Sequence, residues 1–327
     1  MSVPKGETGL QKVGILTSGG DASGMNAAIR AVVRTALYHQ MEAYGIHLGF
    51  EGLMAGNFDL MSRGSVADII HRGGTILQTS RSQIFMTGNG QEKARDELQK
   101  RGIQNLVIIG GNGSLRGGYE LSKLGINVIG IPATIDNDIV YTRSIGFDTA
   151  VNTALEAINR IRDTATSHGR IFIIEVMGRH CGEIALAAGV AGGAESILIP
   201  EIETDLDEVT RKIQQGTQRG KLHSIIILAE GVYPVMELAQ EIEKRTGKDT
   251  RVSILGHTQR GGTPTAVDRI MASRMGMAAV DFIVEGKRNV MVAEEGERIL
   301  PVPLQEVIRG NKTPELAMFE IARILSI

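Results

Sequence analysis

The sequence predicts an α/β protein with two doubly wound, Rossmann-like lobes built around mainly parallel sheets. Three observations predict this fold class: short apolar runs alternate with amphipathic stretches, the runs are almost continuously hydrophobic, and 41 glycines stand against 8 prolines. Continuously hydrophobic strands are typical of parallel sheets covered on both faces, and abundant glycine suits tight strand-to-helix turns. Because 327 residues exceed the usual size of one domain, two lobes are favoured.

The elements follow one another as repeated strand and helix units. A strand at 13–16 leads through a glycine turn into a helical pattern at 25–38. Further hydrophobic runs predict strands at 106–109, 128–131, 171–176, 196–199 and 224–229. A long helix is expected over 148–166 and another from about Asp268. The polar break at 134–138 indicates a crossing between lobes.

Composition excludes several classes of partner. With 35 basic and 37 acidic residues and no block of like charge, polyanion binding is disfavoured. Seven Phe, five Tyr and no Trp argue against a stacking platform for single-stranded nucleic acid. The single cysteine, Cys181, fits a reducing compartment, residues 1–11 lack the apolar core of a signal peptide, and no apolar run reaches bilayer length. We expect a cytoplasmic protein that binds neither nucleic acid nor membranes.

Three glycine-containing loops predict phosphate binding. They lie at 17–21, 72–75 and 110–114, where backbone N–H groups can surround phosphate oxygens. Each alone could be an ordinary tight turn, and the three together favour a phosphate ligand. A Walker A loop is missing, and the glycine spacing after Gly111 fits a dinucleotide-binding turn poorly.

Paired carboxylates and arginines predict phosphoryl transfer. Asp136 and Asp138 follow a strand, where one could accept a proton and the other help hold Mg²⁺, the alternative being a solvated turn. Arginines suited to phosphate stand in or beside such loops, at Arg81, Arg170, Arg179, Arg251 and Arg260. His257 shares a glycine-rich loop at 255–264 with Arg260. The residues alone predict a Mg²⁺-dependent phosphoryl transferase without a P-loop, acting on a hydroxyl of a phosphorylated small molecule.

Four segments, at 15–21, 130–138, 175–182 and 256–262, resemble in this order the bacterial type of the ATP-dependent 6-phosphofructokinase family. The resemblance implies a phosphofructokinase-like fold and transfer of the ATP γ-phosphoryl group to the 1-hydroxyl of fructose 6-phosphate. The product would be fructose 1,6-bisphosphate, in the committed step of glycolysis. It further implies Mg²⁺, a homotetramer, and allosteric regulation by ADP or phosphoenolpyruvate.

The resemblance also implies lobes and catalytic roles. A larger nucleotide-binding lobe is expected at 1–147 with 259–305, and a smaller sugar-phosphate-binding lobe at 148–258 with 306–327. Asp136 would be the base, Asp138 would aid Mg²⁺ binding, Thr134 would contact the transferring group, and Arg81 and Arg179 would stabilise its charge.

Binding residues are implied residue by residue. The nucleotide site would comprise Gly20, Phe50, Arg81, Ser82, Gly111, Asn112, Gly113, Ser114 and Gly117. Thr134, Asp136, Asp138 and Arg179 would also border the sugar phosphate, whose other contacts would be Met177, Gly178, Glu230, His257 and Arg260, with Arg170 and Arg251 from a neighbouring subunit. An allosteric site would use Arg30, Arg34, Arg63, Arg162, Glu195, Arg219 and Lys221.

Departures from the family pattern keep alternatives open. Asn112 replaces a Mg²⁺-binding aspartate, so a higher Mg²⁺ requirement or a weakly active, regulatory subunit is one alternative. A pyrophosphate-dependent enzyme is another, although the small Gly113 and Ala133 favour ATP. Arg116 stands where an apolar residue often meets adenine, and Ser23 and Ser82 also depart from the pattern. A non-enzymatic effector-binding module is disfavoured by the retained base and arginines.

Overall fold

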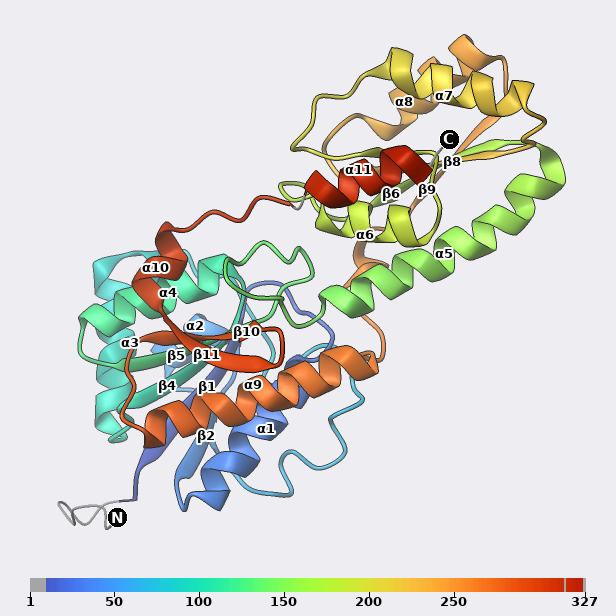
Figure 1. Ribbon diagram of the computed structural model, residues 1–327. Coiled ribbons are helices and arrows are strands. Elements are labelled where there is room, and N and C mark those ends of the chain that lie inside the picture. The colour runs from blue at the N-terminus through green and yellow to red at the C-terminus, as the bar shows by residue number, and fades with distance from the viewer. Residues whose placement is uncertain (1–9, 315, 326–327) are drawn as a thin grey trace. The chain divides into compact units, whose positions relative to one another are not determined.

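The protein is described by a computed structural model covering residues 10–314 and 316–325, so most of the expected N-terminal tail lies outside the described residues. The chain divides into two compact units (Figure 1). The first comprises Met1–Thr134, Ile139–Gly146 and Thr263–Asn311, and the second comprises Ile135–Asp138, Phe147–Gly262 and Lys312–Ile327.

These ranges differ from the expected lobes in four places. Residues 135–138, 147 and 259–262 belong to the second unit, and residues 306–311 belong to the first. The buried Gln259 bonds to Met177 within the second unit, and Val307 packs into the core of the first. Residues 259–262 are therefore attached to the second unit and residues 306–311 to the first, the reverse of what the sequence predicts.

The first unit is a seven-stranded sheet covered by helices. Its strand order is β11-β10-β5-β4-β1-β2-β3, parallel except for the pairs β2–β3 and β10–β11. The strands are β1 Lys12–Ser18, β2 Glu42–Ile46, β3 Phe58–Met61, β4 Asn105–Gly110, β5 Asn127–Pro132, β10 Val290–Glu295 and β11 Arg298–Pro303. The helices are α1 Met25–Tyr38, α2 Gly49–Ala55, η1 Ile84–Met86, α3 Gly88–Lys100, α4 Asn112–Lys123, α9 Ala266–Val284 and α10 Leu304–Arg309.

Apolar side chains of this sheet are buried against helices. On one face, Ile108 of β4 joins a core with Leu53 of α2, Leu115 of α4 and Leu304 of α10. Helices α1 and α9 pack against each other. Helix α1 also contacts β1 and β2, and α9 contacts β5, β10 and β11 (Figure 1). At Gly276 of α9 a β-carbon would lie 2.8 Å from a carbonyl oxygen of α1, so glycine permits this close packing.

The second unit holds a four-stranded, wholly parallel sheet. Its order is β7-β8-β6-β9, with β6 Ile171–Val176, β7 Ser196–Leu198, β8 Ser224–Ala229 and β9 Thr250–Ile254. The helices are α5 Phe147–His168, α6 Glu183–Ala191, α7 Leu206–Gln218, α8 Val235–Thr246, η2 Gly256–Gln259 and α11 Leu316–Leu325. Helices α7 and α8 close one core with Ile171 and Ile226, while α6 packs against α5 and α11 (Figure 1).

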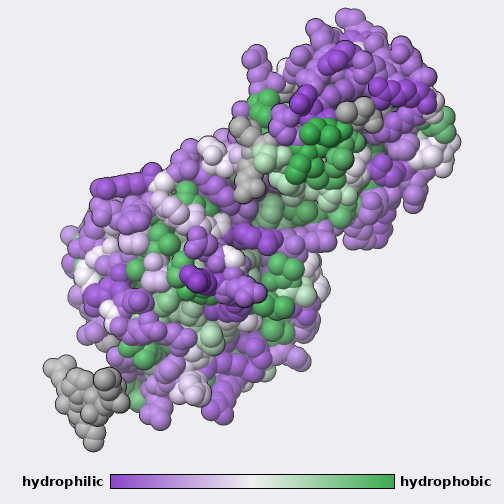
Figure 2. Space-filling model, viewed as in Figure 1, coloured by the Kyte–Doolittle hydropathy of each residue, from purple (hydrophilic) through white to green (hydrophobic). Residues whose placement is uncertain are grey.

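The predicted α/β fold class with mainly parallel sheets is confirmed. Strands β6 and β8 and helix α1 have the bounds expected from the sequence, and the long helix expected over 148–166 extends to 147–168. Figure 2 shows a largely hydrophilic surface with hydrophobic side chains gathered over α11, where Ile321 and Ile324 are exposed. Within the described residues, no helix combines the length and the apolar character needed to cross a bilayer.

Candidate active site

Three loops begin side by side at one edge of the seven-stranded sheet. The last residues of three neighbouring parallel strands are in register, with Ser18 beside Gly110 and Gly110 beside Pro132. Loops that follow parallel strands share the edge where α/β proteins bind ligands. The glycine loops after β1 and β4 and the aspartate loop after β5 therefore start from one place.

Hydrogen bonds fix the loop after β1, which contains Gly20. Thr17 Oγ1 donates to the carbonyl of Gln78 at 2.9 Å, and Thr79 Oγ1 donates to the carbonyl of Gly19 at 2.8 Å. Gly19 has a φ of 86°, and a β-carbon there would lie 3.2 Å from Ser114 Oγ. Glycine therefore allows this turn beside the start of α4.

The start of α4 offers backbone donors. Gly111 is the N-cap residue and provides no side-chain cap, and the first turn carries no acidic residue. Asn112 and Gly113 are exposed, while Ser114 is buried. The Ser114 amide donates to the carbonyl of Gly111 at 3.0 Å, and the helix dipole favours negative charge at this end, so it suits a phosphate.

Of the other nucleotide candidates, Phe50 is largely a core residue. Its ring is stacked on Phe85, with centroids 3.9 Å apart and planes 11° apart. A β-carbon at Gly117 would lie 2.9 Å from both rings, so glycine lets them pack against α4. Arg81 is exposed, and Ser82 Oγ accepts a hydrogen bond from the Phe85 amide at 3.2 Å.

Asp136 is a partly buried carboxylate within a charged group on the second unit. Burial raises the pKa of Asp136, and the nearby Asp138 and Glu230 raise it further, while Arg260 and His180 oppose the shift. A carboxylate with a raised pKa is a stronger base once it is deprotonated. The five side chains thus combine a candidate base with the Arg260 cation, which is able to attract an anionic substrate.

The aspartate loop has an unusual backbone. Asn137 has a φ of 53°, a left-handed conformation that asparagine tolerates better than most residues. Its Nδ2 donates to Glu183 Oε2 at 3.3 Å, which attaches the loop to α6. Thr134, on the first unit, lies with its β-carbon 3.5 Å from the position a β-carbon would take at Gly111. Thr134 therefore borders the start of α4.

A second set of loops leaves one edge of the four-stranded sheet. Strands β8, β6 and β9 are parallel neighbours, so the loops after them start together. The Glu230 amide donates to the carbonyl of Val176 at 2.8 Å, and the Glu230 carboxylate forms an ion pair with Arg179. Met177 and Gly178 follow β6 directly, and Gly178 has a φ of 119°.

The short helix η2 is attached to the end of β6. The Leu255 amide donates to the carbonyl of Glu175 at 3.0 Å, and the Met177 amide donates to Gln259 Oε1 at 2.7 Å. Because η2 contains His257 and Arg260 follows it, both candidates lie on the loop held against Met177. The sequence assigns no role to Gln259 or Glu183, although Gln259 stands between two candidates in one loop.

Arg170 and Arg251 are not part of this cluster. Asp249 forms an ion pair at 2.7 Å with Arg170, which directly precedes β6, and another at 2.9 Å with Arg251, at the start of β9. A six-residue strand spans about 20 Å, so these arginines lie at the opposite edge of the sheet from Met177.

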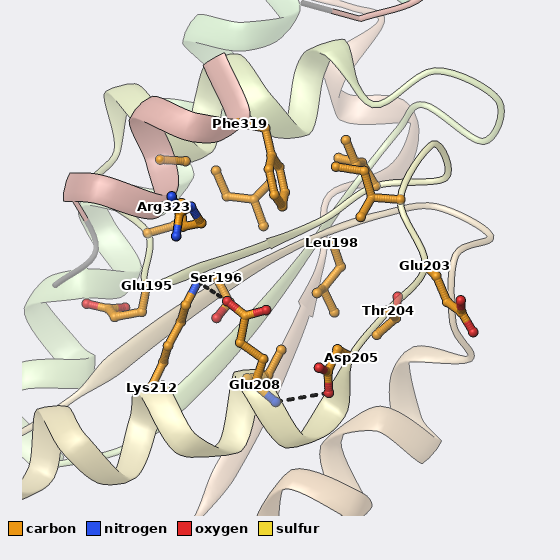
Figure 3. A pocket seen from close by; sticks show the side chains of 16 residues that line it. Glu195, Ser196, Leu198, Glu203, Thr204, Asp205, Glu208, Lys212, Phe319 and Arg323 are labelled. Carbon is orange, nitrogen blue, oxygen red and sulfur yellow. Dashed lines mark hydrogen bonds and ion pairs between the residues drawn. The ribbon is translucent and has the colours of Figure 1, made fainter. Parts of the chain in front are cut away.

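Three effector candidates share one cavity in the second unit. Glu195, Arg219 and Lys221 line a cavity of about 350 Å³, and Lys221 forms an ion pair with Glu195. A neighbouring cavity of about 120 Å³ beneath α11 also includes Glu195, together with Lys212 and Arg323 (Figure 3).

The remaining effector candidates divide between the units. Arg30 and Arg34 lie on α1 and Arg63 follows β3, all in the first unit. Burial and the neighbouring Arg34 lower the pKa of Arg30. Arg162, in the second unit, donates to the carbonyl of Gly192.

Comparison with known proteins gives the family. The family model described as phosphofructokinase matches residues 12–283. Over 319 residues the chain is 55% identical to the ATP-dependent 6-phosphofructokinase of Natranaerobius thermophilus and 51% identical to that of Bacillus subtilis. Each alignment covers 97% of this chain and 100% of the relative.

Solved structures agree with this result. The chain is similar to Pichia pastoris phosphofructokinase in the T-state, with a TM-score of 0.87 and 32% identity over 94% of this chain and 36% of that one. A pyrophosphate-dependent phosphofructokinase from Marinobacter aquaeolei gives a TM-score of 0.84 at 25% identity, covering 94% and 86% of the two chains. This chain therefore belongs to the phosphofructokinase family.

Proposed function

We propose that this chain is an ATP-dependent 6-phosphofructokinase, which transfers the γ-phosphoryl group of ATP to the 1-hydroxyl of fructose 6-phosphate. The observation that carries the proposal is the partly buried Asp136, with its raised pKa, the Arg260 cation and the His180 ring nearby. The full-length identity to ATP-dependent relatives supports the same assignment. The products would be fructose 1,6-bisphosphate and ADP.

Asp136 would act as the general base. Its carboxylate accepts the proton of the sugar 1-hydroxyl as that oxygen forms a bond to the γ-phosphorus and the bond from phosphorus to the bridging oxygen of ADP breaks. Arg179 and Arg81 would stabilise the charge on the transferring group, and Thr134 would contact it. The start of α4, with Gly111 and Ser114, would hold nucleotide phosphates together with Gly20.

The sugar phosphate would be bound by the second unit. His257 and Arg260 on the η2 loop would hold the 6-phosphate, because both can donate to phosphate oxygens. Met177, Gly178 and Glu230 would contact the sugar. The main-chain bonds that join these loops to the end of β6 support a fixed arrangement of the donors.

A Mg²⁺ ion would arrive with the nucleotide. Residues 10–314 and 316–325 contain no cluster of three or more His, Cys, Asp or Glu side chains able to hold a metal by themselves. Mg²⁺ commonly takes one or two carboxylates plus substrate phosphates and water. Asp138 would offer a carboxylate oxygen and Asn112 an amide oxygen. When bound, the ion neutralises phosphate charge.

Asn112→Asp should lower the Mg²⁺ concentration needed for half-maximal activity by roughly three- to tenfold, because a carboxylate binds Mg²⁺ more tightly than an amide. Mg²⁺ titrations of initial rate at fixed ATP check this. The new charge at the exposed start of α4 should also raise thermal stability slightly, through the helix dipole. An Asn112→Ala variant that needs no more Mg²⁺ than the unchanged protein would show that residue 112 is not a ligand.

We further propose a homotetramer in which Arg170 and Arg251 complete the sugar-phosphate site of a neighbouring subunit. Their position at the opposite edge of the sheet from Met177 supports this sharing, and the exposed apolar face of α11 supports assembly. Glu195, Arg219 and Lys221 would bind an anionic effector, ADP or phosphoenolpyruvate, with Arg162. Arg30, Arg34 and Arg63 would complete that site.

Hybrid complementation tests the shared site. Asp136→Asn and Arg251→Ala proteins, each nearly inactive alone, should regain activity when unfolded together and refolded as a 1:1 mixture. With random assembly, about a quarter of the sites would combine an intact Asp136 with an intact Arg251 from the neighbour. Refolded mixtures that stay as inactive as either parent would place Arg251 and Asp136 in the same subunit's site.

Donor choice tests the activity. The purified chain, given fructose 6-phosphate and either ATP or pyrophosphate across a Mg²⁺ titration, should form fructose 1,6-bisphosphate with ATP only. Turnover with pyrophosphate would contradict the donor assignment. No turnover with either donor would contradict the enzymatic proposal and favour a regulatory subunit.

A further inference from the structure

Gln259 joins two loops that bear sugar-phosphate candidates. Its side chain is 1% exposed at the end of η2, and its Oε1 accepts a hydrogen bond from the Met177 amide at 2.7 Å. Only this orientation of the side-chain amide satisfies Met177, because a backbone N–H needs an acceptor. A residue on the His257 loop is thus bonded to the first residue after β6.

Fold stability alone does not account for a glutamine at this position. Gln259 Nε2 is buried and has no hydrogen-bond partner among the described residues. A buried donor without a partner destabilises a fold, whereas leucine or methionine would fill a similar volume without one. The bond to Met177 is therefore the contact that distinguishes glutamine from an apolar residue here.

The Gln259 bond lies where regular pairing has ended. The β6–β9 ladder stops at Glu175 beside Ile254, and one further main-chain bond joins Leu255 to Glu175. Beyond that point the chain turns at Gly178, whose φ of 119° lies outside the β-strand region. Gln259 therefore extends the connection between the two segments past the end of the ladder.

We infer that Gln259 is a positioning residue for sugar-phosphate binding, an inference that rests on the proposed function. By holding the Met177 amide, it sets the place of Gly178 and Arg179 relative to His257 and Arg260. The residue touches no reacting atom and acts through Met177. Without the bond from Met177 to Gln259, the spacing between the loop after β6 and the His257 loop is no longer fixed, and both loops carry donors for the sugar phosphate.

Gln259→Leu should raise the KM for fructose 6-phosphate about tenfold, because displaced binding groups lose much of their contribution. The KM for ATP should stay within about twofold, since the start of α4 and the loop after β1 are untouched. Calorimetric titration with fructose 6-phosphate should show the same weakening without turnover.

Two variants separate positioning from folding. Thr210→Val removes another buried side-chain hydrogen bond of the second unit, on α7, and should lower thermal stability while leaving the KM for fructose 6-phosphate unchanged. Gln259→Glu keeps an acceptor for Met177 and should retain the KM within about threefold.

The inference fails if Gln259→Leu loses stability as Thr210→Val does but binds fructose 6-phosphate normally. If Gln259→Leu does not fold, Gln259→Glu decides, and a tenfold rise in its KM would overturn the inference. Turnover by the unchanged protein tests the proposed function itself, so the two failures are distinguishable.

Discussion

Asp136→Asn is expected to lower kcat by roughly 10³-fold, which is within the usual contribution of a general base. Asparagine keeps the size of the side chain but cannot accept the proton of the sugar hydroxyl. The KM values should change far less, because the phosphate-binding residues remain. Steady-state kinetics with varied fructose 6-phosphate and varied ATP measure both effects. Asp163→Asn, an exposed change on α5 of the same unit, is the matched control and should leave kcat unaltered.

The pH profile identifies the base independently. Because burial and the neighbouring Asp138 and Glu230 raise the pKa of Asp136, the group becomes protonated at a higher pH than an ordinary aspartate as the pH falls. A protonated carboxyl cannot accept the proton, and kcat/KM reports the pKa of the free enzyme, so kcat/KM for fructose 6-phosphate should fall as the pH drops through this raised pKa. The residual rate of Asp136→Asn should lack this acidic limb. A limb that persists in the variant would assign the titration to another group.

Gly113→Asp is expected to lower kcat/KM for ATP by at least ~10²-fold, because like charges brought together away from water repel by several kcal/mol. Gly113 is exposed at the start of α4, and a β-carbon there would meet no other atom within 4 Å. The substitution therefore introduces charge and bulk at the proposed nucleotide-phosphate site, with open space around the new β-carbon. An acidic residue in the first turn also favours the helix, so thermal stability should not fall.

Gly113→Ala is the control for Gly113→Asp. It alters the backbone freedom and adds one methyl group without charge, so most of the ATP activity should remain. Parallel assays with pyrophosphate show whether the carboxylate changes the donor or only excludes ATP. An aspartate variant that uses ATP as well as the alanine variant does would remove Gly113 from the donor site.

The central strands could be predicted because burial on both faces makes them continuously hydrophobic. Residues 171–176 and 224–229 are such runs, and the structure gives β6 and β8 these bounds. Three of the edge strands, β3, β9 and β11, carry no such signal. Strand β3 is half-exposed and β11 contains two prolines, and both pair antiparallel to a neighbour. Strand β9 reads Thr-Arg-Val-Ser-Ile and owes its place to pairing with β6.

For the proposed site, the sequence predicts loops but not the contacts within and between them. Glycine and charged residues after strands indicated which loops matter, since loops that follow parallel strands meet at one edge. The bond from Met177 to Gln259 joins residues 82 positions apart, so no local pattern reveals it. Phe50 was expected in the nucleotide site but is largely buried. Its ring packs against Phe85 in a space that Gly117 leaves open, which no local pattern reveals either.

The most direct test of the central claim follows a labelled phosphoryl group. The purified chain is incubated with ATP labelled at the γ-phosphorus, Mg²⁺ and fructose 6-phosphate, and the labelled sugar product is identified beside the same reaction with Asp136→Asn. Label on the 1-oxygen of fructose 1,6-bisphosphate, formed by the unchanged protein and nearly lost in the variant, is the result expected. Label that stays in ATP, or transfer that proceeds equally without Asp136, would contradict the account.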